Sequence, residues 1–470
     1  MTEQDPAPPR AAVIDTSLRS PAQRYRTFAG ILVNTALANI TTSYLWFALT
    51  FWVYLQTRNV IATGVVGGAY MLLIAVSSIS FGTLVDRYRK LAVMRFAAGF
   101  TLVMFVLSGV MFLLTPPAAL LDLTQPWFWV FTLVILVGAV VENMRNIALS
   151  TTVTILIEPD RRANANGLVG MVQGLMFIVT SVLSGLSVGL LGMGWTIAVA
   201  IVLTALAFAH LLTLRMPEEV RAAATDAHGG FDLRGSLAAV LAIPGLFALI
   251  LFSTFNNFIG GVYMALMDPY GLEMFPVELW GTYFALGATG FIVGGALIGK
   301  FGLGSNPLRT MLLAVILMGA LGAVFTLREW AWLYIAGIWL YLVLVPFVEA
   351  AEQTIIQQVV PLQRQGRVFG FAMAFESAAA PITAFLVAPI AQVWIIPYAR
   401  SAEGAAQLAP LLGEGTSRGI ALVFLIAGTI MIAAALLAFL TPVYRQVSAT
   451  YAETAAAASE TANTASSSPG

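Results

Sequence analysis

Four carboxylates stand deep inside long apolar stretches of the sequence, where an ionisable side chain needs a chemical reason. A charge at the centre of a bilayer costs at least about 2.5–3.5 kcal/mol. With a helical rise of about 1.5 Å per residue, three of these acids lie near the middle of the bilayer, and the fourth, Glu352, lies nearer the cytosol. Acids at such depth are typical of groups that handle a proton or a substrate. The three at mid-depth are Glu142, Glu349 and Glu376.

The spacing of these acids suggests two kinds of local chemistry. Arg145 follows Glu142 by three residues, so the two side chains share a helical face and are close enough for an ion pair. This pair is either a static contact that holds its helix in register or part of the proton or substrate path, and the sequence leaves both open. Glu349 and Glu352 also share a face, and because two nearby carboxylates in a low dielectric resist being charged together, at least one is expected to exchange a proton near neutral pH. We therefore predict proton handling by Glu142, Arg145, Glu349 and Glu376.

Other side chains inside the apolar stretches are candidates for lining a cavity. The asparagines among them either face such a cavity or form hydrogen bonds between helices. The aromatic and methionine side chains among them offer apolar surface, although most aromatics in such a chain face lipid or neighbouring helices. A cavity with this lining and few acids suits a bulky apolar or cationic amphiphile better than a sugar or a multiply charged anion. The substrate-cavity candidates are Asn34, Asn39, Trp46, Asn256, Asn257, Tyr263, Met264 and Glu352.

The elements that position these residues follow from composition. The chain has 470 residues, of which 59% are hydrophobic and 10% charged, and a mean hydropathy of +0.88. Soluble domains carry about 25% charged residues. Each apolar run is about 20 residues or longer, enough to cross about 30 Å of hydrocarbon. We therefore expect an all-α integral membrane protein with twelve spans. They lie near 28–56, 60–84, 91–115, 127–157, 164–190, 195–215, 238–267, 278–299, 308–327, 330–359, 366–397 and 418–440.

Charge placement predicts the orientation of these spans. With the N-terminus inside, 18 of the 23 basic residues fall in inside segments, so the positive-inside rule places both termini in the cytosol of a multi-pass protein in the cytoplasmic (inner) membrane. The first 27 residues lack the apolar region of a cleavable signal. The last residues are rich in Ala, Thr, Ser and Glu, which is typical of a disordered tail.

Internal similarity divides the spans into two halves. Asn39 pairs with Asn256, and Gly82 with Gly299, at one offset of 217 residues. Two six-helix bundles in parallel repeat, enclosing a site near mid-depth, are typical of alternating-access transporters. The predicted organisation is a cytosolic tail at 1–27, a six-helix bundle at 28–215, a cytosolic linker at 216–237, a second bundle at 238–440 and a cytosolic, largely disordered tail at 441–470.

Composition also excludes several function classes. Cysteine is absent, which excludes thiol catalysis and thiolate metal sites. Only two histidines occur, which leaves few residues for histidine-based metal or acid-base chemistry. The sequence contains no nucleotide-binding glycine-rich loop ending in Lys-Ser or Lys-Thr. Net charge is zero, which gives no indication of nucleic acid. We expect no metal, no cofactor and no enzymatic activity. The expected partners are a small hydrophobic or amphiphilic substrate, protons and membrane lipids. The protein is expected to be a monomer.

Three loop segments resemble a known family. The segment 82–90, Gly-Thr-Leu-Val-Asp-Arg-Tyr-Arg-Lys, resembles the loop-two signature of the major facilitator superfamily, with Arg89 at the second glycine position of the signature. Segments 159–166 and 357–370 are similar to those of its macrolide- and siderophore-efflux branch, although Ser184-Gly185 replaces the Gly-Pro pair of antiporters. The resemblance implies a secondary exporter of hydrophobic compounds driven by proton antiport. A lysolipid or lipid flippase of the same fold is the alternative, and a membrane-embedded enzyme or sensor is a more distant one.

The loop-two segment also predicts a gate. Gly82 permits close helix approach, and Asp86 can accept hydrogen bonds from unpaired N–H groups at another helix N-terminus. We expect Asp86 to contact the N-terminus of the span that begins near Gly366 when the cytosolic side is closed. The predicted gating residues are Gly82, Asp86, Arg87, Arg89, Lys90, Gly366 and Arg367.

Overall fold

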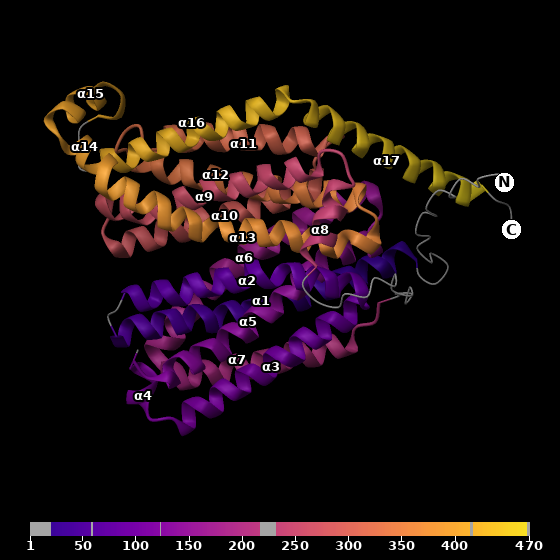
Figure 1. The fold of residues 1–470 in the computed structure, drawn as a ribbon, viewed down its shortest axis with the longest axis horizontal. Helices are drawn as coiled ribbons and strands as arrows, with labels where there is room; N and C mark the ends of the chain where they lie inside the picture. The colour runs from indigo at the N-terminus through magenta and orange to yellow at the C-terminus, as the bar shows by residue number, and fades with distance from the viewer. Residues whose placement is uncertain (1–19, 58–59, 123, 217–231, 414–416, 468–470) are drawn as a thin grey trace.

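The computed structural model describes residues 20–57, 60–122, 124–216, 232–413 and 417–467 (Figure 1). Every regular element within these residues is a helix, which confirms the predicted all-α class. The expected cytosolic tail before residue 20 and the linker from 217 to 231 lie outside the described residues.

The amino-terminal half consists of long helices whose ends are set by proline and by extended residues. Pro117 and Pro126 occupy the first turns of their helices, where the N–H that proline lacks would be unpaired anyway. The first long loop begins at Thr115, which is extended directly before Pro116. The elements are α1 (Pro21–Thr57), α2 (Val60–Arg87), α3 (Lys90–Leu114), α4 (Pro117–Leu121), α5 (Pro126–Leu156), η2 (Pro159–Arg161), α6 (Arg162–Leu186), the π-helical turn η3 (Ser187–Leu191) and α7 (Gly192–Thr213).

The carboxy-terminal half repeats this plan with additional short helices. Three of its helices begin at a polar cap: the Asn306 side chain accepts from the Arg309 N–H, Asp232 accepts from the Gly235 N–H, and Ser401 accepts from the Gly404 N–H. The elements are α8 (Leu233–Leu241), α9 (Leu246–Met274), α10 (Val277–Phe301), α11 (Pro307–Val324), α12 (Ala331–Val359), η4 (Leu362–Arg364), α13 (Gln365–Ile390), the π-helical turn η5 (Ala391–Ile395), α14 (Ile396–Arg400), α15 (Ala402–Leu412), α16 (Arg418–Leu440) and α17 (Pro442–Ser467).

The number of candidate membrane spans among the described residues differs from the predicted twelve. Among the described residues, ten helical stretches are long and apolar enough to cross a membrane. One of them, Pro159–Thr213, contains both α6 and α7, which the sequence predicts to be separate spans. The chain is therefore a multi-pass membrane protein, and the count of twelve stays a prediction.

Two predicted segments differ from the structure. The span expected at 238–267 is divided, because α8 ends at Leu241 and α9 begins only after Gly245, whose φ of 82° is left-handed. The tail expected to be disordered after residue 440 is instead helical as α17. Its first turns pack on the bundle, since Val447 is buried and Val443 and Tyr444 are partly buried. Alanine-rich sequence favours helix, and this apolar face gives the helix a place to dock.

The two halves meet through glycine-containing helix contacts. A Cβ on Gly82 in α2 would overlap the Gly366 carbonyl in α13, and a Cβ on Gly370 would overlap the Ser78 carbonyl. On the other side, Gly167 in α6 faces Ile298 in α10. Small residues permit such close backbone approach. These contacts lie toward the end where α2 stops and α3 and α13 begin, which we call the basic end.

The halves separate away from the basic end. Figure 1 shows them converging where α8 and α17 lie and diverging toward the end that carries α4, α14 and α15. The structure is therefore closed at the basic end.

Candidate functional site

A cavity of about 170 Å³ lies inside the amino-terminal half. Its polar lining comes from α1, α2, α5 and α6. Of the cavity candidates predicted from the sequence in this half, Asn39 lines it, whereas Asn34 and Trp46 do not. The lining includes Asn39, Phe47, Tyr70, Glu142, Asn143, Asn146, Gln173 and Met176.

Amide side chains form a continuous chain along this cavity. Asn39 donates to Asn146 Oδ1 at 2.8 Å, and Asn146 donates to Asn143 Oδ1 at 3.2 Å. Asn143 donates to the Tyr70 hydroxyl at 3.4 Å. Sequence analysis missed Asn143 and Asn146, although both are polar residues inside an apolar span.

Glu142 and Arg145 form a fully buried ion pair in α5, as their spacing suggested. The second oxygen of Glu142 accepts from Thr101 in α3 at 3.2 Å. Arg145, 0% exposed, also donates to Asn34 Oδ1 in α1 at 2.5 Å. The Asn34 amide in turn reaches the Ala207 carbonyl in α7 at 2.7 Å. The pair therefore connects four helices, which favours the static interpretation of Arg145 and Asn34.

A second cavity of about 210 Å³ lies in the carboxy-terminal half and reaches Gln173 of α6, the residue that it shares with the first cavity. It collects the three acids of α12 and α13 and both asparagines predicted in α9. Its lining includes Ser150, Gln173, Asn256, Asn257, Glu349, Glu352, Met373 and Glu376.

The acids of this second cavity lack a counter-ion among the residues that the structure describes. Glu352 and Glu376 are close enough for their carboxyl groups to share a hydrogen bond, and Oε1 of each has no partner among the described residues. No Lys, Arg or His in the described part of the chain lies within 4.0 Å of either acid or of Glu349. The sequence places Glu352 nearer the cytosol than the other acids. In the structure its side chain is buried, at 7% exposure, whereas that of Glu349 is exposed to the cavity.

Three aromatic and methionine candidates do not line either cavity. Trp46 stacks on Tyr70 with ring centroids 4.6 Å apart. Tyr263, 1% exposed, packs against Phe424, and its hydroxyl donates to the Phe424 carbonyl at 3.2 Å. Gly322 of α11 makes room for this ring, because a side chain there would overlap it. Met264 is 51% exposed on the outer surface. In this conformation the three residues lie outside the two cavities described above, and their place in a substrate cavity stays a prediction.

The gate segment has the contact that the sequence predicted. Asp86 accepts from the Gly366 N–H at 2.6 Å and from the Arg367 N–H at 2.9 Å, so it caps the N-terminus of α13. Lys90 is buried and donates to the Val85 carbonyl at 2.7 Å near the end of α2.

Among the described residues, the arginines of the predicted gate form no ion pair with Asp86. Arg87 and Arg89 are exposed. Arg367 instead lies 3.8 Å from Asp232. Arg87 and Arg89 are therefore free to serve as topology signals.

A further polar cluster at the basic end was not assigned from the sequence. Buried Arg162 of α6 donates to the Gln357 carbonyl of α12 at 2.9 Å. The Gln357 side chain bonds with Asn166 at 2.9 Å and with the Ser150 carbonyl at 2.9 Å. Gln365 of α13 reaches the same Gln357 carbonyl at 3.1 Å. Segments 159–166 and 357–370 were noted only for their resemblance, and their side chains join the two halves.

Comparison with known proteins agrees with this architecture. Macrolide efflux protein A of Streptococcus pyogenes is 23% identical over 372 residues, which cover 77% of this chain and 88% of that protein. A bacterial homologue of the iron transporter ferroportin, in an outward-facing state, superposes with a TM-score of 0.64 at 13% identity, covering 88% of this chain and 100% of that one. The proton:xylose symporter gives a TM-score of 0.62 at 14% identity, covering 88% and 96%. The model of the Major Facilitator Superfamily matches residues 31–384, and the chain therefore belongs to this superfamily of membrane transporters.

Proposed function

We propose that this transporter exports hydrophobic or amphiphilic small molecules, with macrolides as the first class to test, by alternating access coupled to proton antiport. The similarity to macrolide efflux proteins supports export, and the amide, aromatic and methionine lining of the two cavities suits an amphiphile. The positive-inside rule supports a cytosolic basic end, with both termini in the cytosol and the protein in the cytoplasmic membrane. We further propose that the protein acts as a monomer.

The observation that carries proton coupling is the contact between Glu352 and Glu376. Two carboxylates attract one another only if a proton lies between them, since both are otherwise acceptors with like charge. No cation of the described residues lies close enough to replace that proton. Loss of the proton would leave two buried charges, and entry of a cationic substrate or water would then be favoured. The pair thus links proton release to the occupancy of the cavity.

Alternation between the two access states follows from the basic-end contacts. The Asp86 contact with α13 and the Arg162 contact with α12 each join one half to the other. Opening the basic end breaks both, so they bias the balance between states rather than adding general stability.

The test is transport in proteoliposomes with an imposed pH gradient, using a macrolide, a lipophilic cation and a lysolipid. Glu352→Gln and Glu376→Gln should reduce accumulation against a gradient at least about tenfold, while downhill exchange continues, because the gradient-linked proton site is lost.

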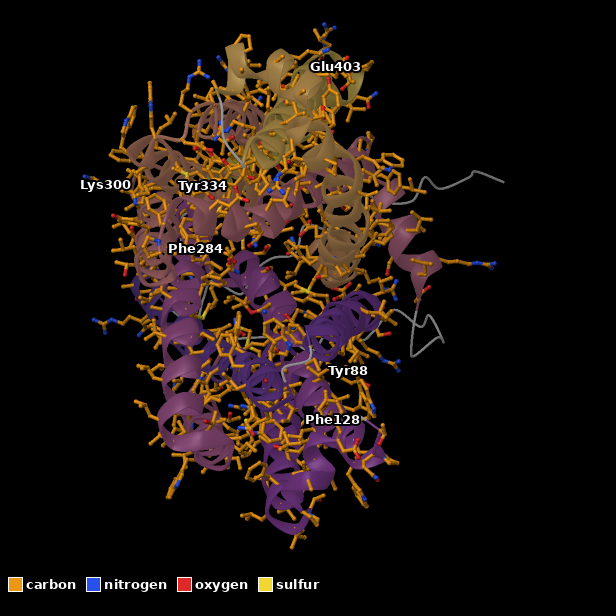
Figure 2. All side chains as sticks on the ribbon, turned by 90° about the vertical axis from the view of Figure 1, so that its left-hand side faces the viewer. Tyr88, Phe128, Phe284, Lys300, Tyr334 and Glu403 are labelled. Carbon is orange, nitrogen blue, oxygen red and sulfur yellow. The ribbon has the colours of Figure 1, made fainter. Side chains whose placement is uncertain are left out.

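The matched control is Glu403→Gln, which removes an exposed acid of α15 that Figure 2 shows at the periphery of the molecule. If both cavity variants still concentrate substrate as the control does, proton coupling lies elsewhere. Net movement of lysolipid alone would favour the flippase alternative.

A further inference from the structure

A cavity of about 350 Å³ at the basic end is separate from the two central cavities. It lies where α1 and α6 begin and α5 ends, and Gly299 of α10 contributes to its wall. Its floor is apolar and includes Leu156, Ile157 and Leu168. Because the cavity lies at the ends of the candidate spans, we expect it to lie at the depth of the lipid head groups.

The rim of this cavity carries unused positive charge. Arg24 and Arg161 line it with one acid, Glu158. Arg24 Nη2 lies 3.1 Å from Glu158, but Arg24 Nε is buried and has no acceptor among the described residues. No carboxylate in the described part of the chain lies within 4.0 Å of Arg161. A guanidinium has five N–H donors and pairs readily with phosphate, so these two side chains have donors to spare.

Two neighbouring features add to this positive field. The N-terminus of α6 opens beside the cavity, and its capping residue, Arg161, makes no side-chain capping hydrogen bond. Unpaired N–H groups at a helix N-terminus attract anions. Lys300 follows Gly299 and extends away from the bundle, as Figure 2 shows.

We propose that this cavity binds the phosphate of an anionic phospholipid from the cytosolic leaflet, with the glycerol and first acyl carbons against the apolar floor. The cationic rim over an apolar floor matches an amphiphile better than free phosphate. Both halves form the wall, and Asn164 beside the cavity donates to the Gly299 carbonyl at 3.0 Å. A lipid bound here therefore touches both halves only while the basic end is closed, and it stabilises that state.

The test uses the full chain in nanodiscs made of phosphatidylcholine with increasing phosphatidylglycerol, and counts the lipids retained by native mass spectrometry. The wild-type protein should prefer phosphatidylglycerol over phosphatidylcholine by about tenfold or more, and Arg161→Gln should lower this preference to about threefold or less. Arg161 makes no ion pair among the described residues, so its loss should leave the fold intact. Arg309→Gln removes the same charge at the same end without lining the cavity and should keep the wild-type preference.

A second measurement follows the closed form of the basic end and distinguishes a lipid phosphate from a free phosphate. Phosphatidylglycerol should shift spin-label distances at the basic end toward the closed form, and the shift should vanish in Arg161→Gln. Inorganic phosphate or glycerol phosphate added to phosphatidylcholine nanodiscs should not reproduce it, because neither covers the apolar floor. Equal effects from inorganic phosphate, or an unchanged lipid preference in Arg161→Gln, would overturn the proposal.

Discussion

The two halves hold their buried acids in opposite ways. In the amino-terminal half, Glu142 is neutralised by Arg145 and accepts a hydrogen bond from Thr101, while Arg145 itself donates to Asn34. In the carboxy-terminal half, Glu352 and Glu376 face each other with no nearby cation of the described residues. A carboxylate in an ion pair stays ionised and so exchanges no proton. Two adjacent carboxylates without a nearby cation favour the binding of one proton. We therefore propose a structural role for Glu142 and proton coupling for Glu352 and Glu376.

The comparison also explains why depth alone is a poor guide to function. Glu142 and Glu376 both stand well inside their spans, and the sequence places them in one predicted set. Their surroundings differ because α5 carries its own arginine one turn later, while α12 and α13 carry none in the cavity. A buried ion pair is a device for holding helices together, and its removal is costly even when its net contribution is small.

The largest expected effect comes from breaking the paired acid. Arg145→Met should lower the free energy of unfolding by about 3–5 kcal/mol, because it leaves Glu142 buried without a counter-ion. The measurement is thermal or denaturant unfolding of the purified protein in one detergent. The double variant Glu142→Gln with Arg145→Met removes both charges and should recover most of the loss. If the single variant is as stable as the wild type, Glu142 is not a structural acid and the comparison fails.

Asp86 is a third kind of acid, half-buried and held by backbone N–H groups instead of a cation or another acid. Asp86→Asn should favour the inward-open form about tenfold, a shift of about 1.4 kcal/mol, because an amide keeps one acceptor and loses the charge that the α13 N-terminus attracts. The measurement is a spin-label distance between Leu212→Cys in α7 and Arg309→Cys in α11, since the chain has no native cysteine.

The control for this shift is Asp160→Asn, which removes an exposed aspartate at the same end. It should leave the distance distribution as it is in the labelled parent. An unchanged distribution in Asp86→Asn as well would show that the contact with α13 does not bias the two states.

The sequence predicted the parts of this molecule that depend on local pattern. Apolar runs gave the helices, and the spacing of Glu142 and Arg145 gave their ion pair, because neighbours on a helix are fixed by its geometry. The contact of Asp86 with the helix at Gly366 followed from the repeat and from the need of a helix N-terminus for an acceptor.

The sequence could not predict which side chains share a cavity, because that depends on how helices from distant segments rotate against one another. Tyr263 points into the core since Gly322 on α11 leaves space for it, a fact about another helix. The same holds for Gln173, which reaches both cavities from α6. The docking of α17 likewise depends on a surface that α11 and α12 provide and that composition alone does not reveal.

The smallest expected effect separates Glu349 from the other two acids of the second cavity. Glu349 is exposed to the cavity, so water can screen its charge, and its interaction with the buried pair is worth about 1 kcal/mol or less. Glu349→Gln should therefore change the initial rate of gradient-driven export by no more than about fivefold, whereas Glu376→Gln stops accumulation. Both are measured in the same proteoliposomes, with downhill exchange as the check on folding. If Glu349→Gln abolishes accumulation as completely as Glu376→Gln does, the exchanging group is the exposed acid, and the lesson drawn from the buried pair is wrong.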